Sequence, residues 1–550
     1  MKKHNILKVV LLSILVALLC TWIFPSASYQ SSLTVGDRSQ LGIFDLFSYA
    51  VELFRYFPYV VLMTLATGIF YGVAYKIPAY QVLLENLVKK FKGKENICLA
   101  VIMTLIAVIV SVSGLSFGII FVFPFVISLV LLMGYNKLVA ASVTVGSTIV
   151  GILGTTIGSN TTYYINAVLS TEVTNEMITK VVILVVALVL LIYNVLAYAK
   201  KTKNNTDKVV DFVPNKTEGK EEKIVEEKVS KKADTKKDTN KKEDKSSKKT
   251  DAKKKAATKK TSSTKAKTTA KKTTAKKTTA KKTSTKTRAY DLKSKVETKV
   301  TVKPKKKVKT WPFILVFDLA LILLAISSFD WSGVFEVKIF SDALTAIKEF
   351  EIEGFPIFAK ILGKVNAFGE WSLTSEMPTL IIISSAFLAF IYGLKLDEFL
   401  DGVVDGVKKA IKPAIYMLLV YLVLVIATYN PFQLNITKFF LDMTKGLNVI
   451  TMSIVAMVSS VINIECTYVA QSTLPYVTSV ITDSALYPLL AIIFQSIYGL
   501  VMLVAPTSVI LLGTLSYLGI SYGQWLKHIW KLFLQLLIVL VIIFFVVFLI

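Results

Sequence analysis

The stretch GTTIGSNTTYY, Gly154 to Tyr164, is polar and rich in glycine, yet it interrupts an apolar run that begins near Leu138. A second polar stretch, APTS from Ala505 to Ser508, interrupts an apolar run in the second half of the chain. A helix can break inside hydrocarbon only where its freed N–H and C=O groups are buried in protein or line a wet cavity. The two stretches therefore predict two broken helices that form two halves of one site. The alternative for the first stretch is the end of a span followed by an external loop.

The composition around these stretches is that of a membrane protein. The 550 residues are 54% hydrophobic, and the mean hydropathy is +0.60. Much of this hydrophobicity lies in runs with few charges, each long enough to cross the ~30 Å hydrocarbon core as a helix. The sequence therefore predicts an all-α polytopic membrane protein.

Nearly all of the excess charge lies in one segment. Residues 200–309 contain 40 Lys and Arg against 14 Asp and Glu, or +26 of the formal net charge of +27. The segment is rich in Lys, Thr, Ala and Ser and cannot bury enough apolar surface to offset the entropy of ordering. We therefore expect a first membrane repeat at 1–199, a disordered cytoplasmic linker at 200–309 and a second membrane repeat at 310–550.

The linker can be interpreted as a solvated tether or as a segment that binds a partner. As a tether, it contacts anionic lipid head groups of the bilayer through its lysines. Its repeat KKTTAKKTTAKKTS is similar to the tails of histone-like proteins, so nucleic acid is the less favoured partner.

Positive residues stay in the cytoplasm, so the linker sets the orientation of the spans. The N-terminus and the linker are then cytoplasmic, and the C-terminus is outside the cell membrane. The first span is expected to be uncleaved, although a secretory signal also fits its flanks. The expected spans of the first half are Ile6–Phe24, Phe57–Tyr75, the run from Leu138, and Met177–Tyr198.

Between these spans we expect a surface helix and a hairpin. AYQVLLENLVKKFKGKE, from Ala79, is amphipathic and predicts a helix on the cytoplasmic surface. Two apolar arms, Ile97–Val112 and Phe117–Met133, follow and have positive charge at both outer ends. This pattern favours a re-entrant hairpin that opens inward, although two ordinary spans also fit.

The second half follows the same plan with one crossing added. Trp311–Ser327 and Met377–Leu394 are expected spans, DEFLDGVVDGVKKAIK a second surface helix, and Pro413–Thr428 the extra span. The arms Leu447–Ile462 and Tyr468–Ile481 then open from the opposite side, so the two repeats are inverted. Inverted repeats with helices broken at corresponding positions indicate a secondary transporter with a midplane site.

Small polar residues stand at both hairpin tips. Glu465 is one of few acids in the predicted membrane segments, and such residues are functional candidates by default. It is expected to accept a proton or to pair with a cationic substrate, unless it lies in water at the mouth of a shallow hairpin. Asp318, in the first span of the second half, has a structural or a coupling role. The substrate-binding candidates at the tips are Ser113, Gly114, Ser116, Asn463, Glu465 and Thr467.

Several longer stretches resemble one carrier family. FPFVISLVLLMGYNK and APTSVILLGTLSYLGISYGQWLKHIWKLF, with the segments before the first hairpin, are similar to the YfcC-like and C4-dicarboxylate anaerobic carrier family. The resemblance covers both membrane halves but not the linker, and the acid stands in the second hairpin here rather than in the first. It implies a substrate and ion site lined by Ser159, Asn160, Thr161, Pro506, Thr507 and Ser508.

The expected function is secondary active transport of a small carboxylate or amino acid by alternating access. Coupling to Na+ or H+ stays open, and a homodimer is a further expectation. No HExxH motif, P-loop or nucleophile–base spacing is present, so an enzyme is not expected, nor is a cofactor or metal. The alternative function is a membrane-tethered scaffold whose linker binds nucleic acid or acidic partners.

Overall fold

The computed structural model describes residues 5–158, 162–202, 308–444 and 447–550. These ranges belong to one unit, which we describe by itself. The linker expected at 200–309 lies almost entirely outside the described residues, so its predicted disorder and its contacts stay predictions.

The first half is helical apart from one short hairpin of strands, in which Ala27 pairs with Val35 and Tyr29 with Leu33. Its helices agree with the expected spans to within a few residues at most ends. The elements are α1 (Asn5–Ile23), β1 (Ala27–Tyr29), β2 (Leu33–Val35), α2 (Asp45–Tyr56), α3 (Pro58–Lys76), α4 (Pro78–Lys90), α5 (Glu95–Ser113), η1 (Gly118–Val122), α6 (Phe123–Leu132), α7 (Lys137–Ala141), η2 (Ser142–Gly146), α8 (Ser147–Leu153), α9 (Tyr164–Leu169) and α10 (Met177–Thr202).

The second half is also helical. Its described elements are α11 (Trp311–Ser327), α12 (Ile339–Glu349), α13 (Ile357–Leu362), α14 (Glu376–Ile391), α15 (Leu396–Tyr429), α16 (Gln433–Asp442), α17 (Val449–Ile462), α18 (Cys466–Val480), η4 (Ser484–Leu486), α19 (Tyr487–Met502), α20 (Val509–Leu518) and α21 (Tyr522–Leu549). Among the described helices, seven are long and apolar enough to cross a membrane. The predicted class, an all-α polytopic membrane protein, is confirmed.

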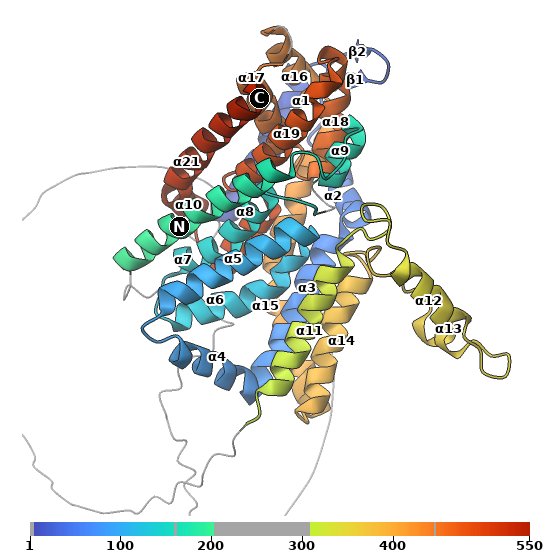
Figure 1. Ribbon diagram of the computed structural model, residues 1–550, viewed down its shortest axis with the longest axis vertical. Helices are drawn as coiled ribbons and strands as arrows, with labels where there is room; N and C mark the ends of the chain where they lie inside the picture. The colour runs from blue at the N-terminus through green and yellow to red at the C-terminus, as the bar shows by residue number, and fades with distance from the viewer. Residues whose placement is uncertain (1–4, 159–161, 203–307, 445–446) are drawn as a thin grey trace, which may run out of the picture. The chain divides into compact units, whose positions relative to one another are not determined.

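The two halves repeat one order of elements. α3 is followed by the short helix α4, the hairpin α5–α6, the broken helix α8 and α9, and the long helix α10. α15 is followed by α16, the hairpin α17–α18, the broken helix α19 and α20, and α21. Figure 1 shows these elements along the chain, with α12 and α13 projecting away from the other helices.

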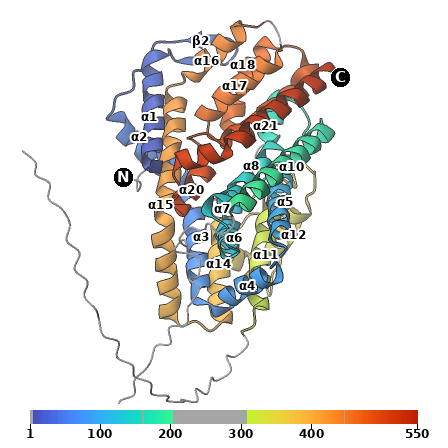
Figure 2. The same ribbon diagram turned by 90° about the vertical axis from the view of Figure 1, so that its left-hand side faces the viewer.

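The repeats are inverted because α3 and α15 run antiparallel. Gly72 lies against Gly402, whereas Gly68, one turn earlier in α3, lies against Gly406, one turn later in α15. A Cβ at Gly72 would overlap the carbonyl oxygen of Gly402, and a Cβ at Gly406 would overlap that of Gly68. Small residues four apart allow such close backbone approach between membrane helices. α4 and α16 consequently lie at opposite ends of this pair (Figure 2).

One prediction for the second half is wrong. DEFLDGVVDGVKKAIK is not a separate surface helix, because residues 397–412 form the first half of the continuous helix α15. The backbone contacts of Gly402 and Gly406 with α3 keep this part in the bundle, while its acids and lysines remain mostly exposed. Pro413 is accommodated inside the helix. α16, rather than this stretch, occupies the position that α4 has in the first half.

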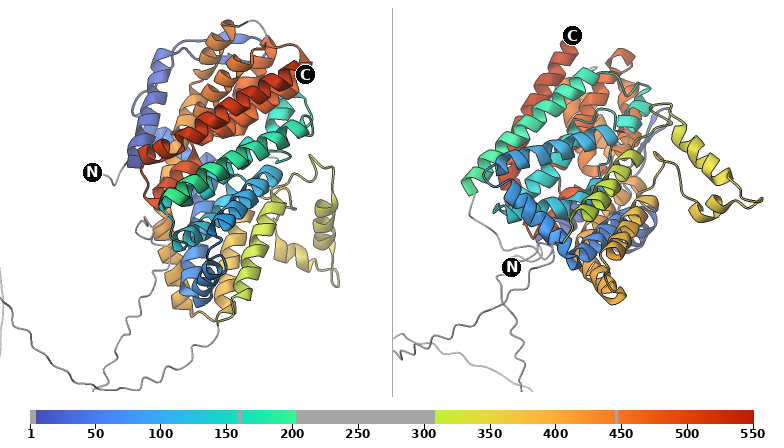
Figure 3. Two further views of the ribbon diagram at one scale, coloured as in Figure 1. Left: turned by 60° about the vertical axis from the view of Figure 1, so that its left-hand side comes forward. Right: turned by 60° about the horizontal axis from the view of Figure 1, so that its bottom comes forward.

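Both predicted helix breaks are present in the structure. α8 ends at Leu153 and α9 begins at Tyr164, whereas α19 ends at Met502 and α20 begins at Val509. The predicted arms are also observed as helical hairpins, which can be followed in Figure 3. It stays a prediction that the hairpins are re-entrant rather than pairs of full spans.

Candidate functional site

The tip of the first hairpin is a tight turn at Gly114. This residue has a φ of 72°, in the left-handed region that glycine adopts without strain, and it ends α5. The hydroxyl of Ser113 donates to the carbonyl of Ile109 at 2.6 Å and accepts the Leu115 amide at 3.2 Å. Ser113 and Gly114 therefore shape the tip, and Ser116 is the candidate of this hairpin that lines a cavity.

The first helix break is bonded to this hairpin. The amides of Thr156 and Gly158 both donate to the carbonyl of Ser111, at 3.1 and 3.2 Å. The Ser111 hydroxyl donates in turn to the carbonyl of Gly154 at 2.8 Å. Hydrogen bonds from the hairpin thus satisfy backbone groups that the break has freed.

The second break is bonded to the second hairpin in the corresponding way. The Thr507 hydroxyl donates to the carbonyl of Val461, in the last turn of α17, at 2.8 Å. The Thr156 hydroxyl donates to the Ser111 carbonyl in a similar way, at 3.2 Å, in addition to the Thr156 backbone amide.

Aromatic side chains from α21 complete the second break. Trp525 Nε1 donates to the carbonyl of Leu503 at 2.9 Å, and the Tyr522 hydroxyl donates to that of Val504. The Trp525 side chain is fully buried, which excludes a role as an anchor at the membrane interface. A freed carbonyl inside the bundle needs a donor, and the indole N–H supplies one.

The two repeats are also bonded to each other near the breaks. Gln495 of α19 donates from Nε2 to the carbonyl of Thr155, in the first break, at 2.5 Å. Within the second repeat, Tyr498, one turn further along α19, donates to the carbonyl of Ile464 at the second hairpin tip at 3.0 Å. A Cβ at Gly499 would overlap the backbone of Leu153, so α19 and α8 approach closely beside both breaks.

A cavity of about 290 Å³ lies where the two hairpin tips and the second break come together. Four of the sequence candidates line it: Ser116, Glu465, Thr467 and Ser508. Both repeats therefore contribute to one cavity. The other lining residues include Tyr59, Phe117, Ile149, Ile152, Tyr164, Leu373, Cys466, Tyr498, Met502, Val509 and Ile510.

Glu465 is the charged side chain among the residues that line this cavity, and two phenols contact it. The Tyr421 hydroxyl of α15 donates to Glu465 Oε1 at 2.6 Å, and the Tyr59 hydroxyl of α3 donates to the same oxygen. The two hydroxyls are 2.7 Å apart. The Tyr59 ring also meets Phe117 of the first tip edge-on, with centroids 5.8 Å apart. We call Glu465, Tyr59 and Tyr421 the acid–phenol cluster.

The remaining candidates lie elsewhere. Asn463 is buried in a network between α16, α17 and α18, where its amide group donates to Gln433 and, at 2.9 Å, to Ser472. Pro506 is not among the residues that line the cavity, and Thr507 contacts Val461 as described. Asp318 is exposed on the outer face of α11, among apolar side chains. Ser159, Asn160 and Thr161 lie outside the described residues.

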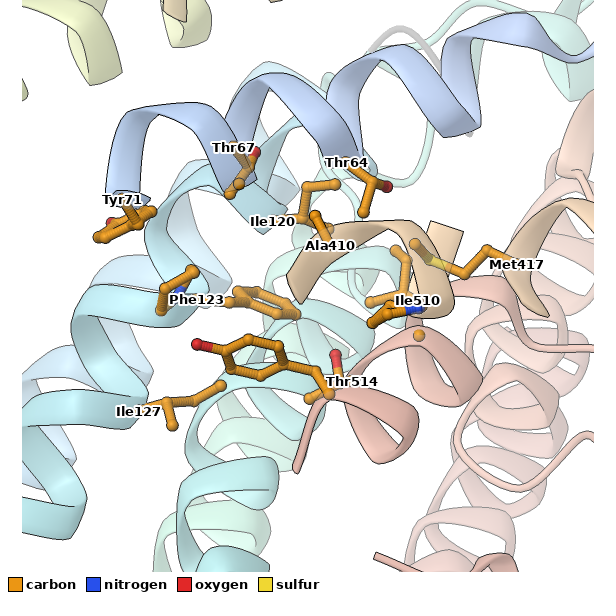
Figure 4. A pocket seen from close by; sticks show the side chains of 15 residues that line it. Thr64, Thr67, Tyr71, Ile120, Phe123, Ile127, Ala410, Met417, Ile510 and Thr514 are labelled. Atoms are coloured by element: carbon orange, nitrogen blue, oxygen red, sulfur yellow. The ribbon is translucent and has the colours of Figure 1, made fainter. Parts of the chain in front are cut away.

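A second cavity, of about 70 Å³, lies between α3, α6, α15 and α20 and is mostly apolar. Figure 4 shows Thr64 and Thr67 of α3 on one side of it, Phe123 and Ile127 of α6 on another, and Thr514 of α20 opposite. Its small size and mostly apolar walls do not suit a charged solute. Within the described ranges, no three His, Cys, Asp or Glu side chains come together as metal ligands.

Two inverted repeats, paired hairpins and helices broken at a shared cavity define the chain as a membrane transporter of the inverted-repeat class. The family model DcuC, C4-dicarboxylate anaerobic carrier, matches residues 4–258 and 264–549. The chain therefore belongs to this family, and membership supports a carrier rather than an enzyme. The match also extends into the basic segment, which the resemblance had left out. No curated protein and no solved structure matches the chain.

Proposed function

We propose that this protein carries a C4-dicarboxylate across the cell membrane by alternating access, with the substrate bound in the cavity between the hairpin tips. The observation that carries the proposal is that both tips and the second break line one cavity. Its volume of about 290 Å³ is close to the lower end of the ~300–1,000 Å³ typical of small-molecule sites. Family membership supplies the substrate class.

The cavity offers hydroxyls and helix ends to a carboxylate. Ser116, Thr467 and Ser508 provide hydroxyl donors, and α18 and α20 begin at the cavity with Cys466 and Val509. Helix N-termini present free N–H groups and positive dipole ends that favour anions. The chain has arginine only at positions 38, 55 and 288, outside the expected spans. Recognition in this proposal therefore relies on neutral donors.

The acid–phenol cluster favours coupling to protons. Three oxygens, those of Tyr59, Tyr421 and Glu465 Oε1, lie within mutual hydrogen-bonding distance. In our proposal Glu465 is protonated when the substrate binds, which removes the repulsion between its carboxylate and a dicarboxylate in the same cavity. Release of that proton after transport then couples the substrate to H+.

The proposed orientation follows from the positive-inside rule. The N-terminus and residues 200–309 are cytoplasmic, and the C-terminus is outside. α3 then crosses from outside to inside and α15 from inside to outside, so the two hairpins enter from opposite sides. Alternating access in this arrangement is movement of the hairpin-and-break units relative to the α3–α15 pair.

The test is uptake of radiolabelled succinate into proteoliposomes that hold folded protein. One arm has an inward proton gradient, a second an inward Na+ gradient at equal pH, and a third no gradient. We expect the proton gradient to accelerate uptake most strongly. Uptake that responds to Na+ alone would overturn proton coupling, and no succinate uptake in any arm would overturn the dicarboxylate assignment.

Glu465 supports one second candidate, a cationic amino acid. An ionised carboxylate in the cavity is a partner for an ammonium or guanidinium group. The same vesicles loaded with lysine or arginine distinguish the two substrates. Exchange of external labelled arginine for internal arginine, without succinate transport, would favour this candidate.

A further inference from the structure

The C-terminal end of α10 and the first turns of α21 enclose a groove of about 470 Å³. Lys200 and Lys201 of α10 and Lys531 of α21 line it, together with Tyr198, His528 and Asn194. We call it the lysine groove. α10 and α21 lie side by side in Figures 2 and 3. The groove is separate from the cavity between the hairpin tips, with which it shares no lining residue.

The polar wall of the groove is built by contacts between the two helices. Asn194 Nδ2 donates to Gln535 Oε1 at 2.8 Å, and the Tyr198 and His528 rings meet with centroids 4.2 Å apart. His528 Nε2 is in turn 2.8 Å from the Ser142 hydroxyl. These contacts engage the amide and imidazole groups, whereas all three lysines are exposed. None of the three forms an ion pair with a carboxylate of the described residues.

Apolar side chains continue from the groove along both helices. Val189 and Tyr193 of α10 are 59% and 67% exposed, and Ile538 and Ile542 of α21 are 59% and 55% exposed. Both helices are long and apolar enough to span a membrane. Exposed apolar side chains on such helices face the acyl chains of lipids. By the proposed orientation, the lysine end lies at the cytoplasmic interface. A ligand that fits both parts has an anionic head and apolar chains.

We propose that the lysine groove binds the phosphate of an anionic phospholipid from the inner leaflet, with its acyl chains along the exposed apolar faces of α10 and α21. Three ammonium groups that form no ion pair with a described carboxylate attract the negative charge of a phosphate, and basic pockets between membrane helices bind such head groups. The exposed apolar side chains that continue from the groove favour a lipid over a soluble phosphate. α10 ends at Thr202, directly after Lys200 and Lys201, and the basic segment follows it in the sequence.

The test compares two triple variants of the full chain in vesicles of phosphatidylcholine with one fifth phosphatidylglycerol. The first is K200Q/K201Q/K531Q. The second, K89Q/K90Q/K92Q, is the matched control, because it removes the same charge from exposed lysines in and just after α4, at the same predicted membrane surface. Phosphatidylglycerol retained after detergent extraction is counted by native mass spectrometry. The linker is present in every sample and contributes equally.

We expect retention of phosphatidylglycerol to fall by roughly tenfold or more in the groove variant, because the attraction of three lysines is lost, and to change little in the control. Equal retention in both variants would overturn the proposal. Glycerol phosphate is added as a competitor, and full displacement of the lipid by it would identify a site for soluble phosphate instead.

A photoreactive phosphatidylglycerol with its reactive group on an acyl chain locates the lipid independently. Cross-linked peptides from 189–198 and 534–542 are expected. Cross-links confined to α4 or to other helices would contradict the proposal. Neither measurement depends on transport, so the result stands apart from the proposed carrier function.

Discussion

The two repeats build the same arrangement with different chemistry at their hairpin tips. The first tip has a glycine turn and small hydroxyls, with the amides of Thr156 and Gly158 bonded to the carbonyl of Ser111. The second tip has Glu465, which contacts one phenol from each repeat. A shared backbone plan thus positions the cavity, while one tip alone contributes the acid. Four changes test this comparison, in order of decreasing effect.

The largest effect is expected from Glu465→Gln, which makes the second tip as neutral as the first. A glutamine accepts the Tyr59 and Tyr421 hydrogen bonds but releases no proton. We expect proton-driven succinate uptake to fall to the level of protein-free vesicles, while exchange of internal for external succinate survives. Asp318→Asn is the control, since this acid is exposed on α11, and it should leave both measurements unchanged. Proton-driven uptake by E465Q would refute the role of the acid.

The close approach that the repeats share is tested by Gly72→Ala. The added Cβ would overlap the Gly402 carbonyl oxygen, so α3 and α15 must separate. Overpacking of this kind lowers the free energy of unfolding by about 1–3 kcal/mol. Because the clash here is with the backbone, we expect a loss near the upper end of this range. The apparent melting temperature in detergent measures it. Gly523→Ala is the matched control, because its Cβ meets nothing within 4 Å. Equal melting of both variants would contradict the α3–α15 contact.

Trp525→Phe tests how the second break is supported. The variant keeps an aromatic ring but loses the N–H that donates to the Leu503 carbonyl. A buried acceptor left without its donor destabilises by about 1–2 kcal/mol. The melting temperature is expected to fall, and Trp530→Phe, on the exposed side of α21, is expected to have little effect. If the two substitutions lower the melting temperature equally, α21 does not complete the break.

The smallest effect is expected from substitutions of Thr507 and Thr156, which compare the two helix breaks. Thr507 reaches Val461 through its side chain, whereas Thr156 reaches Ser111 through its backbone amide as well as its hydroxyl. Thr507→Val should therefore lower stability by about 0.5–1.5 kcal/mol, and Thr156→Val by less. Thermal unfolding of the two variants side by side measures the difference. A larger loss in T156V would reverse this assignment.

Hydropathy and polar interruptions were enough to predict the spans, hairpin arms and breaks, because each is encoded within one continuous stretch. The first part of α15 was mistaken for a surface helix, since its charges and Pro413 resemble the end of a membrane segment. GIFYG at Gly68–Gly72 and GVVDG at Gly402–Gly406 were the signal that could have corrected this. Paired small-xxx-small motifs indicate two helices in close contact.

The partners of the candidate residues could not be predicted in the same way. Tyr59 and Tyr421 come from α3 and α15, and a single sequence contains no signal that they meet Glu465. Asn463 was placed at the substrate site, but its amide is used within the second hairpin network. Trp525 likewise donates to the carbonyl of Leu503, which lies 22 residues earlier in the chain. These assignments depend on contacts between distant segments, which local patterns do not specify.

In the proposed function both hairpin tips bind one substrate, and protection of cysteines by the substrate tests this arrangement. Ser116→Cys and Thr467→Cys are made separately in a chain whose Cys20, Cys98 and Cys466 are replaced by serine, and labelling by a small thiol reagent is followed in vesicles. Thr514→Cys, in the apolar cavity, is the control. We expect succinate to protect both tip cysteines with the same concentration dependence and to leave the control unprotected. Protection of one tip alone, or of neither, would contradict a shared site.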